Sequence, residues 1–172
     1  ALLARQAPPE AGRAHNKMIG FLPTKGGLGT STLTLNAAIE LARMRKDLAT
    51  AVVELQEGSG TLALQLGLED PERAGIGLPV LLARPLSYIT KQTLREHMVE
   101  HPSGLHALLA ATRPVGVEPA LDQARARTIL RYLTAEYDYV LLDLPSRLDE
   151  ACREALVMCD QIIATVEPSR IG

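Results

Sequence analysis

A glycine-rich stretch near the start of the chain has the residue types and spacing of a phosphate-binding loop. Residues 23–32 read PTKGGLGTST, with three glycines before the hydroxyl residues Ser31 and Thr32. Glycines let a loop wrap closely around an anion, and a helix that starts there adds a favourable dipole. A serine hydroxyl at this point is the Mg²⁺ ligand of such loops. The stretch therefore predicts a nucleotide site with Mg²⁺, and the alternative is a plain glycine-rich turn leading into a helix.

The loop departs at two positions from the usual phosphate-binding pattern, G-x-x-x-x-G-K-[ST]. Thr24 stands at the first glycine, and Thr30 stands at the lysine that reaches the outer phosphates. Lys25 supplies a positive charge from the start of the loop. We expect ATP or ADP to bind on residues 24–32. The expected contacts are made by Lys25, Gly26, Gly27, Leu28, Gly29, Thr30, Ser31 and Thr32.

The segments around this loop alternate between strand-like and helix-like patterns. Expected strands are 18–23, 49–55, 104–110, 138–145 and 161–168, and expected helices are 31–45, 61–68, 78–83, 89–99, 121–137 and 148–159. Strands that are apolar on both faces and alternate with helices imply an α/β fold, a mostly parallel sheet with helices on both faces in three layers. Ligands bind such sheets beyond the carboxyl ends of the strands, where the glycine loop, Glu54 and Asp143 all lie.

The stretch KGGLGTST resembles the deviant Walker A loop, KGGxGKTT or KGGxGxST, of the MinD/ParA family of P-loop ATPases. The loop has a small residue in place of the family's second lysine, and in this it is similar to the CpaE/TadZ-like branch. That branch comprises pilus-assembly and localisation proteins. Segments 54–68 and 137–169 are also similar to that branch. The resemblance implies an ATPase domain at residues 18–172 that is incomplete at its C-terminus. Residues 1–17 have linker composition and are expected to follow a receiver-like domain.

The resemblance also assigns roles to residues that match the family's motifs. Lys25 falls on the signature lysine, which in family members reaches across an ATP-dependent homodimer to the partner's phosphates. Ser31 falls on the Mg²⁺ ligand, Asp143 on the Walker B aspartate that holds the Mg²⁺ shell, and Glu54 on the first switch I aspartate. These three are the candidate metal-binding residues. The residues alone leave two alternatives open. Glu54 is then a solvated carboxylate at a strand end, and Asp143 caps the turn that follows it.

Two of the departures from the family pattern fall on residues that support ATP hydrolysis. Gln56 falls on the second switch I aspartate, which in active members helps to orient the attacking water, and its own alternative is a plain surface amide. An amide is no useful base near neutral pH, and Thr30 removes a cation that faces the phosphates. Lys25 and Gln56 are the candidate catalytic residues of a slow ATPase. We expect a regulatory ATPase whose nucleotide state controls dimerisation and localisation, or a nucleotide-binding scaffold without hydrolysis.

Composition argues against several other classes of protein. The 172 residues are enough for one core, and a net charge of −2 from intermixed acidic and basic residues gives little support for nucleic-acid binding. No apolar run approaches the length of a membrane span. Cys152 and Cys159 have the spacing of buried thiols on one helix face and indicate a reducing compartment. We expect a cytoplasmic protein whose partners, by resemblance, are pilus or secretion assembly proteins that can recruit it to the membrane or pole.

One motif points to a different chemistry. His97, Glu100 and His101 match H-x-x-E-H, in which two histidines one helical turn apart hold Zn²⁺ and the glutamate serves as base. This pattern makes a zinc hydrolase the remote alternative. Pro102 follows at once, so we expect the helix to end on the second histidine. Charged and imidazole residues at an exposed helix end are the preferred interpretation.

Overall fold

The computed structural model describes residues 16–56, 59–68, 71, 74–113 and 121–168 of the chain. The elements in chain order are β1 (Lys17–Pro23), α1 (Thr30–Met44), β2 (Thr50–Glu54), α2 (Leu62–Gln65), α3 (Leu78–Leu82), the 3-10 helix η1 (Leu86–Tyr88), α4 (Lys91–Glu96), β3 (Val99–Glu100), β4 (His106–Leu108), α5 (Gln123–Glu136), β5 (Tyr139–Asp143), α6 (Glu150–Met158) and β6 (Gln161–Thr165). Each of the predicted strands and helices has a counterpart among them.

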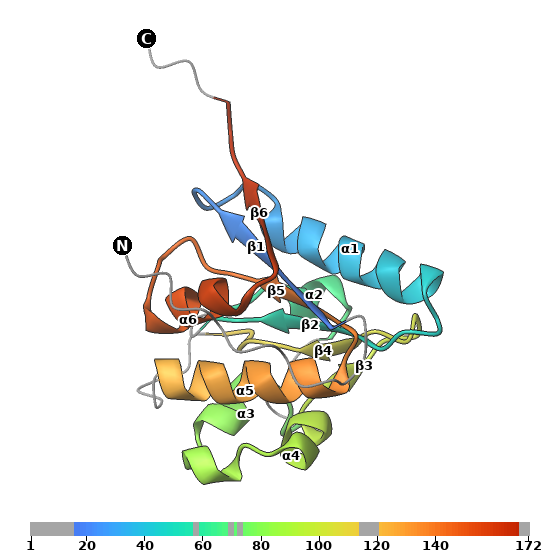
Figure 1. Cartoon of the computed structure of the whole chain (residues 1–172), viewed down its shortest axis with the longest axis vertical. Coiled ribbons are helices and arrows are strands. Elements are labelled where there is room, and N and C mark those ends of the chain that lie inside the picture. The colour runs from blue at the N-terminus through green and yellow to red at the C-terminus, as the bar shows by residue number, and fades with distance from the viewer. Residues whose placement is uncertain (1–15, 57–58, 69–70, 72–73, 114–120, 169–172) are drawn as a thin grey trace.

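The described strands form one twisted sheet with the order β3-β4-β2-β5-β1-β6 (Figure 1). The pairs β4 with β2, β2 with β5, β5 with β1 and β1 with β6 are parallel, and β3 with β4 is antiparallel. Parallel neighbours require crossover connections, which the helices supply. The expected mostly parallel sheet is confirmed. The carboxyl ends of β1, β2 and β5 lie side by side in the middle of the sheet.

Alternate residues of each central strand face opposite helical layers. Val52 of β2 and Leu141 of β5 belong to a buried cluster with residues of α1 and α2. Val53 and Leu142 belong to a second cluster with residues of α3, α4, α5 and α6. A strand that is apolar on both faces is therefore buried on both, as the continuous apolar runs predict. The result is the expected three-layer arrangement, visible in Figure 1 as α1 on one side of the sheet and α5 on the other.

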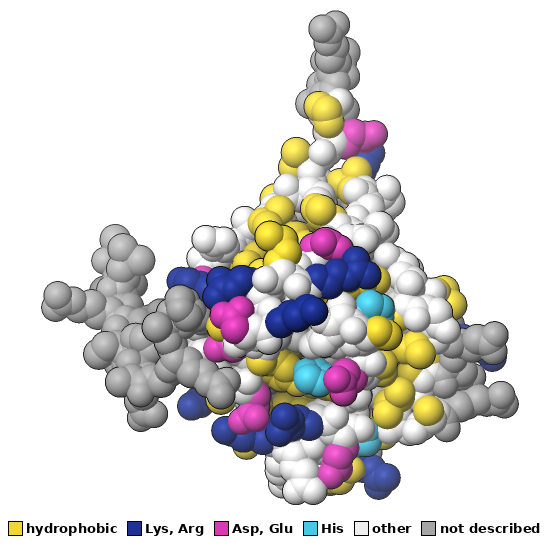
Figure 2. All heavy atoms as spheres, turned by 90° about the vertical axis from the view of Figure 1, so that its right-hand side faces the viewer, with side chains coloured by type: hydrophobic (Ala, Val, Ile, Leu, Met, Phe, Trp, Pro, Cys, Tyr) yellow, Lys and Arg dark blue, Asp and Glu magenta, His cyan; other side chains and the backbone are white. Residues whose placement is uncertain are grey.

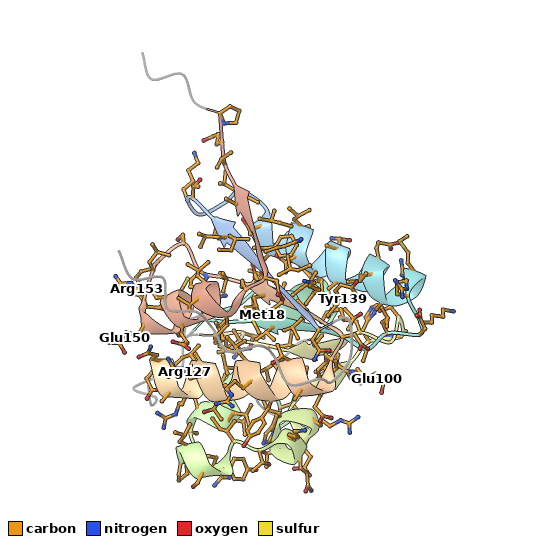
Figure 3. All side chains as sticks on the ribbon, viewed as in Figure 1. Met18, Glu100, Arg127, Tyr139, Glu150 and Arg153 are labelled. Carbon is orange, nitrogen blue, oxygen red and sulfur yellow. The ribbon has the colours of Figure 1, made fainter. Side chains whose placement is uncertain are left out.

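An ion pair between the buried Glu154 and the exposed Arg127 fixes α6, the helix that follows the carboxyl end of β5, against α5. Arg127 donates two hydrogen bonds to the Glu154 carboxylate, at 2.6 and 2.9 Å, and Gln123 donates a third at 2.8 Å. These bonds lower the pKa of Glu154, with the Arg127 bonds as the main cause. Figure 3 shows Glu150 and Arg153 on the outer side of α6. The inward face of α6 is thus held by Glu154, while its outward face is charged and exposed.

The structure differs from the sequence prediction at residues 97–106. The helix expected to continue to residue 99 ends at Glu96, and Val99–Glu100 forms β3 instead. A tight turn joins β3 to β4: the His101 amide donates to the Leu105 carbonyl at 2.8 Å, and Gly104 has a φ of 86°. A strand of two residues is too short to show a period in the sequence. Tertiary pairing with β4 therefore decides its conformation.

Strand β6 lies at one edge of the described sheet and pairs with β1. Ile162 and Ile163 are 51% and 41% exposed, and Val166 beyond the strand is 66% exposed. These three side chains and the free strand edge are called the β6 edge below. Figure 2 shows hydrophobic side chains on this projecting end of the molecule, and interspersed basic and acidic side chains below it. The face that is shown has no continuous band of basic side chains among the residues described.

Two further sequence predictions concern the ends and membrane segments. Of the predicted linker, residues 1–15 lie outside the described part of the chain, and Lys17 already belongs to β1. Searching the described residues for a helix long and apolar enough to cross a membrane finds none.

Candidate phosphate-binding site

The loop between β1 and α1 has the backbone of a phosphate cradle. Gly27 and Gly29 have φ values of 82° and 72°, in the left-handed region that favours glycine. A Cβ at either position would meet no neighbouring atom. Glycine is therefore needed there for its backbone conformation and not to avoid a steric clash. Gly29 precedes α1, and no side chain caps this helix. The free N–H groups of the first turn of a 15-residue helix are therefore available to an anion.

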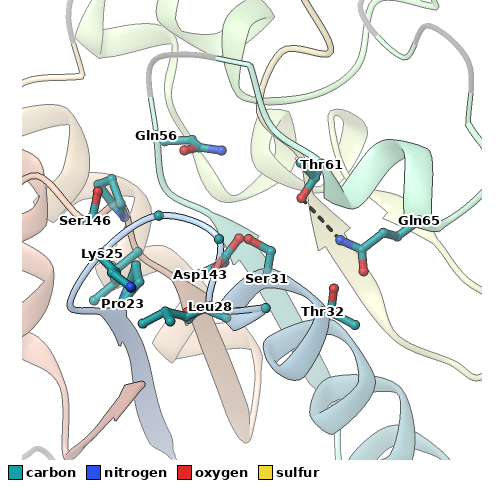
Figure 4. Close-up of a pocket in the computed structure, with 16 residues that line it drawn as sticks. Pro23, Lys25, Leu28, Ser31, Thr32, Gln56, Thr61, Gln65, Asp143 and Ser146 are labelled. Carbon is teal, nitrogen blue, oxygen red and sulfur yellow. Dashed lines mark hydrogen bonds between the residues drawn. The ribbon is translucent and has the colours of Figure 1, made fainter. Parts of the chain in front are cut away.

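A pocket of about 380 Å³ opens over this loop (Figure 4). Four stretches of chain meet there: the loop itself, the segment just after β2, the two ends of α2, and the end of β5 with the residues that follow it. The lining residues are Pro23, Lys25, Gly26, Gly27, Leu28, Gly29, Thr30, Ser31, Thr32, Gln56, Thr61, Gln65, Asp143, Leu144, Pro145 and Ser146. All eight predicted loop contacts, Gln56 and Asp143 are among them.

Ser31 and Asp143 meet on the floor of the pocket. The Ser31 hydroxyl and the Asp143 carboxylate face each other in Figure 4. Asp143 is 4% exposed, and burial raises its pKa to about 6. The interaction with Ser31 lowers this pKa in part, and the negative charge of Glu54 raises it further. No positively charged side chain among the described residues pairs with this buried carboxylate. These oxygen donors fit a hard divalent cation such as Mg²⁺, which would remove that deficit.

The structure does not bring Glu54 to this pair of oxygen donors. Glu54 is 0% exposed and does not line the pocket, although it lies opposite Asp143 in the β2 and β5 register. Its carboxylate accepts backbone hydrogen bonds from Thr61, Leu62 and Ala110. The alternative of a solvated strand-end carboxylate is therefore wrong. The geometry also does not support direct ligation of a metal in the pocket by Glu54. Burial raises the pKa of Glu54, and the three backbone hydrogen bonds oppose that shift.

Gln56, Thr61 and Gln65 form the wall of the pocket that faces the loop. The Gln56 amide makes two long contacts of 3.4 Å, to Glu54 Oε1 and to the Ser59 carbonyl. Gln65 donates to the Thr61 hydroxyl at 3.2 Å, as Figure 4 shows. Gln56 is half-buried on the pocket wall and is thus not a plain surface amide. Sequence reasoning missed Thr61 and Gln65, although two polar residues four apart in the short helical segment after β2 are a usable signal.

The end of β6 is attached to both ends of the loop. The amide and hydroxyl of Thr24 donate to the Thr165 carbonyl at 3.1 and 3.0 Å. Thr30, which is 5% exposed, shares a hydrogen bond of 2.6 Å between its hydroxyl and that of Thr165. The Lys25 ammonium pairs with the Glu167 carboxylate. Thr30 is therefore engaged with β6, and Thr165 and Glu167 were not predictable as partners of the loop from the sequence.

The H-x-x-E-H interpretation is wrong, because these residues do not share a helix. His97 follows the end of α4 and contacts the Gly75 carbonyl at 2.9 Å through Nδ1, while Glu100 lies in β3. His101 Nδ1 lies 2.9 Å from the Ser103 hydroxyl. Throughout the described residues, no three His, Cys, Asp or Glu side chains are grouped so that they could hold a metal ion. The zinc hydrolase alternative has no structural basis there.

The burial of Asp143 leads to a prediction about stability. The folded state binds the Asp143 proton more tightly than the unfolded chain, where the pKa is near 3.8. The nucleotide-free protein should therefore lose stability as the pH rises from about 4 to about 6, and stay at the lower level above that range. Asp143→Asn keeps an acceptor for Ser31 and has no charge to desolvate. We expect it to be more stable than the parent by about 1–3 kcal/mol at about pH 8 and similar near pH 4.

Urea unfolding of both proteins at the two pH values, without nucleotide or Mg²⁺, measures this difference. Other titrating groups are common to both proteins, so the comparison isolates Asp143. A variant less stable than the parent at the higher pH would contradict the prediction.

A glycine loop between a central strand and a helix, with an aspartate at the end of the neighbouring strand, defines a P-loop nucleotide-binding domain on a mostly parallel sheet. The family model that describes an AAA domain (AAA_31) matches residues 16–172, so the chain belongs to that family. Together with its relatives, this match places the chain among the MinD/ParA P-loop ATPases.

Comparison with known proteins gives the same fold. The chromosome-partitioning ATPase Soj of Thermus thermophilus is 29% identical over 157 residues, which cover 90% of this chain and 56% of Soj. A ParA family ATPase from Chlorobium tepidum superposes with a TM-score of 0.71 at 20% identity, covering 86% of this chain and 59% of that one. The septum site-determining protein MinD of Pyrococcus horikoshii, solved as a complex with Mg-ADP, gives 0.66 at 21% identity, with 89% and 58% covered. The chain thus spans little more than half the length of these relatives.

Proposed function

We propose that the chain binds Mg²⁺-ATP or Mg²⁺-ADP on residues 24–32 and that the nucleotide controls its association with a second copy. The observation that carries the proposal is the meeting of a glycine loop, a free helix N-terminus and the Ser31–Asp143 pair in one pocket. The loop amides and the helix dipole suit the phosphates, and Ser31 and Asp143 suit the Mg²⁺ that would accompany them. The Mg-ADP complex of the Pyrococcus MinD protein supports this assignment.

Each polar residue of the pocket then has a role. The Ser31 hydroxyl would be a direct Mg²⁺ ligand, and Asp143 would hold the ion or its water shell and supply the opposite charge. The Thr32 hydroxyl and the amides of residues 26–31 would bind phosphate oxygens. Mg²⁺ would neutralise charge on the phosphates, as it does in phosphoryl transfer generally. The wall formed by Gln56, Thr61 and Gln65 would face the outermost phosphate from the far side of the loop.

We propose slow hydrolysis, with a scaffold that binds nucleotide without hydrolysis as the second candidate. The specific observation behind both is the position of Thr30, whose hydroxyl is engaged with Thr165 and offers no positive charge to the phosphates. Gln56 can orient a water molecule through hydrogen bonds but cannot act as a base near neutral pH. Lys25 can supply a cation to a partner's phosphates only when it leaves Glu167 and a second copy closes over the site.

The wider role that we propose is that of a cytoplasmic regulatory or localisation protein of the CpaE/TadZ type. Its support is the loop KGGLGTST, in which a small residue replaces the second lysine of the MinD/ParA signature. The partners would be pilus or secretion assembly proteins that the chain engages in one nucleotide state. A receiver-like domain before residue 18 would provide the regulatory input.

Nucleotide binding can be tested by titration calorimetry with Mg²⁺-ADP and Mg²⁺-ATP. We expect micromolar affinity, which is on the order of −8 kcal/mol of binding free energy. Gly29→Val should weaken binding at least about tenfold, because the left-handed backbone at this position is strained for a β-branched residue and the loop would open. Gly104→Val is the matched control, since this position also has a positive φ and open space for a side chain but does not line the pocket and lies in the β3–β4 turn. Absence of heat with both nucleotides, or equal binding by the Gly29 variant, would overturn the assignment.

A further inference from the structure

The Glu54 carboxylate sits in a cup of backbone amides where β2, β4 and the start of α2 meet. Its Oε1 accepts from the Thr61 amide at 2.6 Å and from the Leu62 amide at 3.1 Å. Its Oε2 accepts from the Ala110 amide at 3.1 Å, just beyond the end of β4. Charge-assisted bonds of this kind are stronger than bonds between neutral groups. One side chain therefore connects three segments of the chain that are distant in sequence.

The segment that carries Thr61 is pressed directly onto this carboxylate. A Cβ placed on Gly60 would overlap the Glu54 carboxylate, so any larger residue requires the carboxylate or this segment to shift. The Gly60 amide also donates to the Ala111 carbonyl at 2.6 Å, and Ser59 pairs with Ala111 in a parallel bridge. Residues 59–62, called the strap below, are thus held against the ends of β2 and β4 from both sides.

The strap determines where one wall of the pocket stands. Thr61 belongs to it, and Gln65 is hydrogen-bonded to the Thr61 hydroxyl one helical turn later. Gln56, on the same wall, contacts Glu54 Oε1 as well. The side chains that face the glycine loop from across the pocket therefore all depend on the carboxylate behind them, which itself never reaches the pocket surface.

We propose that Glu54 is a positioning residue for the nucleotide site: its buried carboxylate fixes the strap and thereby sets the distance of Thr61 and Gln65 from the phosphate loop. The proposal rests on the proposed nucleotide-binding function and replaces the direct metal contact expected for Glu54. This role requires two acceptor oxygens on the side chain, one facing the amides of Thr61 and Leu62 and the other facing the amide of Ala110. A glutamine of the same shape satisfies one side and turns an NH₂ group toward an N–H group on the other.

The test compares Glu54→Gln with Glu154→Gln. Glu154 is the matched control, since it is also a buried, hydrogen-bonded glutamate but joins α5 to α6 away from the pocket. Titration calorimetry with Mg²⁺-ADP is carried out under solution conditions in which denaturant unfolding curves show that each protein is folded. We expect Glu54→Gln to weaken binding about fivefold to thirtyfold, and Glu154→Gln to lower stability with affinity within about twofold of the parent. Equal loss of affinity in the two variants would overturn the proposal.

Hydrogen exchange without nucleotide separates this inference from the proposed function. We expect Glu54→Gln to speed exchange of the amides of Thr61, Leu62 and Ala110, while the amides of α5 stay protected. Unchanged protection at those three amides would sink the positioning role, even if Mg²⁺-ADP binding is normal. If the parent binds no nucleotide, only the proposed function is overturned. Hydrogen exchange at the three amides still decides whether Glu54 fixes the strap.

A second variant keeps the test valid if Glu54→Gln does not fold. Gly60→Ala leaves the carboxylate intact but pushes the strap away from it, because the added Cβ overlaps Glu54. It should reproduce both the weaker Mg²⁺-ADP binding and the faster exchange at Thr61 and Leu62. Glu54→Asp retains two acceptor oxygens on a shorter side chain, so it should recover part of the affinity that glutamine loses. A Gly60→Ala protein with parental affinity and exchange would contradict the proposal.

Discussion

Replacing Thr30 with lysine and Gln56 with aspartate together should raise steady-state ATP hydrolysis by about 10- to 1000-fold over the parent chain. Phosphoryl transfer is accelerated mainly by positioning and by positive charge near the transferring phosphate, and the pocket is poor in such charge. Lysine at position 30 would restore a cation at the start of α1. Aspartate at position 56 would place a carboxylate on the wall that faces the outermost phosphate. The parent should be slow, and the Thr30→Lys single variant intermediate.

The structure adds a requirement to this experiment. The Thr30 hydroxyl is bonded to Thr165, so the substitution removes a buried contact as well as adding a charge. Thr30→Val is the matched control, because it keeps the branched shape, loses the hydroxyl and brings no cation. It should lower stability by about 1 kcal/mol without raising hydrolysis. A parent that already hydrolyses ATP as fast as the double variant would show that Thr30 and Gln56 are not deficits.

Lys25→Ala should weaken ATP-linked dimerisation, raising the dimer dissociation constant by at least about tenfold while leaving the folded monomer intact. Lys25 is exposed on the loop and is held by Glu167 in the same chain. A cation in this place can reach phosphates bound to a second copy across a two-fold axis. The exposed ion pair with Glu167 is weak enough that Lys25 can exchange it for those phosphates. The hydrolysis rate of the parent should accordingly rise more steeply than in proportion to protein concentration.

Light scattering with and without Mg²⁺-ATP, over a range of protein concentrations, measures the association. Glu167→Gln is the informative companion variant, since it releases Lys25 without removing its charge and should dimerise at least as well as the parent. Nucleotide-linked dimerisation that survives Lys25→Ala would show that this lysine does not act across the dimer.

The elements of the fold follow from the sequence because their patterns are local. Apolar runs such as 49–55 and 138–145 are buried on both faces, and the helix after the glycine loop begins at Thr30, within one residue of its predicted start. Strand β3 was not predictable in this way, since two residues have no period and its conformation depends on pairing with β4.

The site was predictable only in part, for a related reason. Ser31 and Asp143 stand at positions whose chemistry the motif specifies, and they meet as expected. The partners of Glu54 are amides 7, 8 and 56 residues away, and those of Thr30 lie 135 residues away. Backbone amides carry no signature in a sequence. The difference between a carboxylate at a pocket and one buried behind it therefore emerges only when the strands and loops are placed together.

The β6 edge has a consequence for handling the protein in solution. Within the part of the chain that the structure describes, β6 has no second neighbouring strand, and its open edge with two exposed isoleucines is a template onto which another extended segment can add. Such strand addition needs no nucleotide and would be insensitive to Lys25. It is also largely hydrophobic, so salt would strengthen it where salt weakens contacts between charges. Aggregation through this edge and dimerisation at the phosphate loop can thus be told apart by their opposite responses to ionic strength, and a lysine gatekeeper at Ile162 or Ile163 would suppress the first alone.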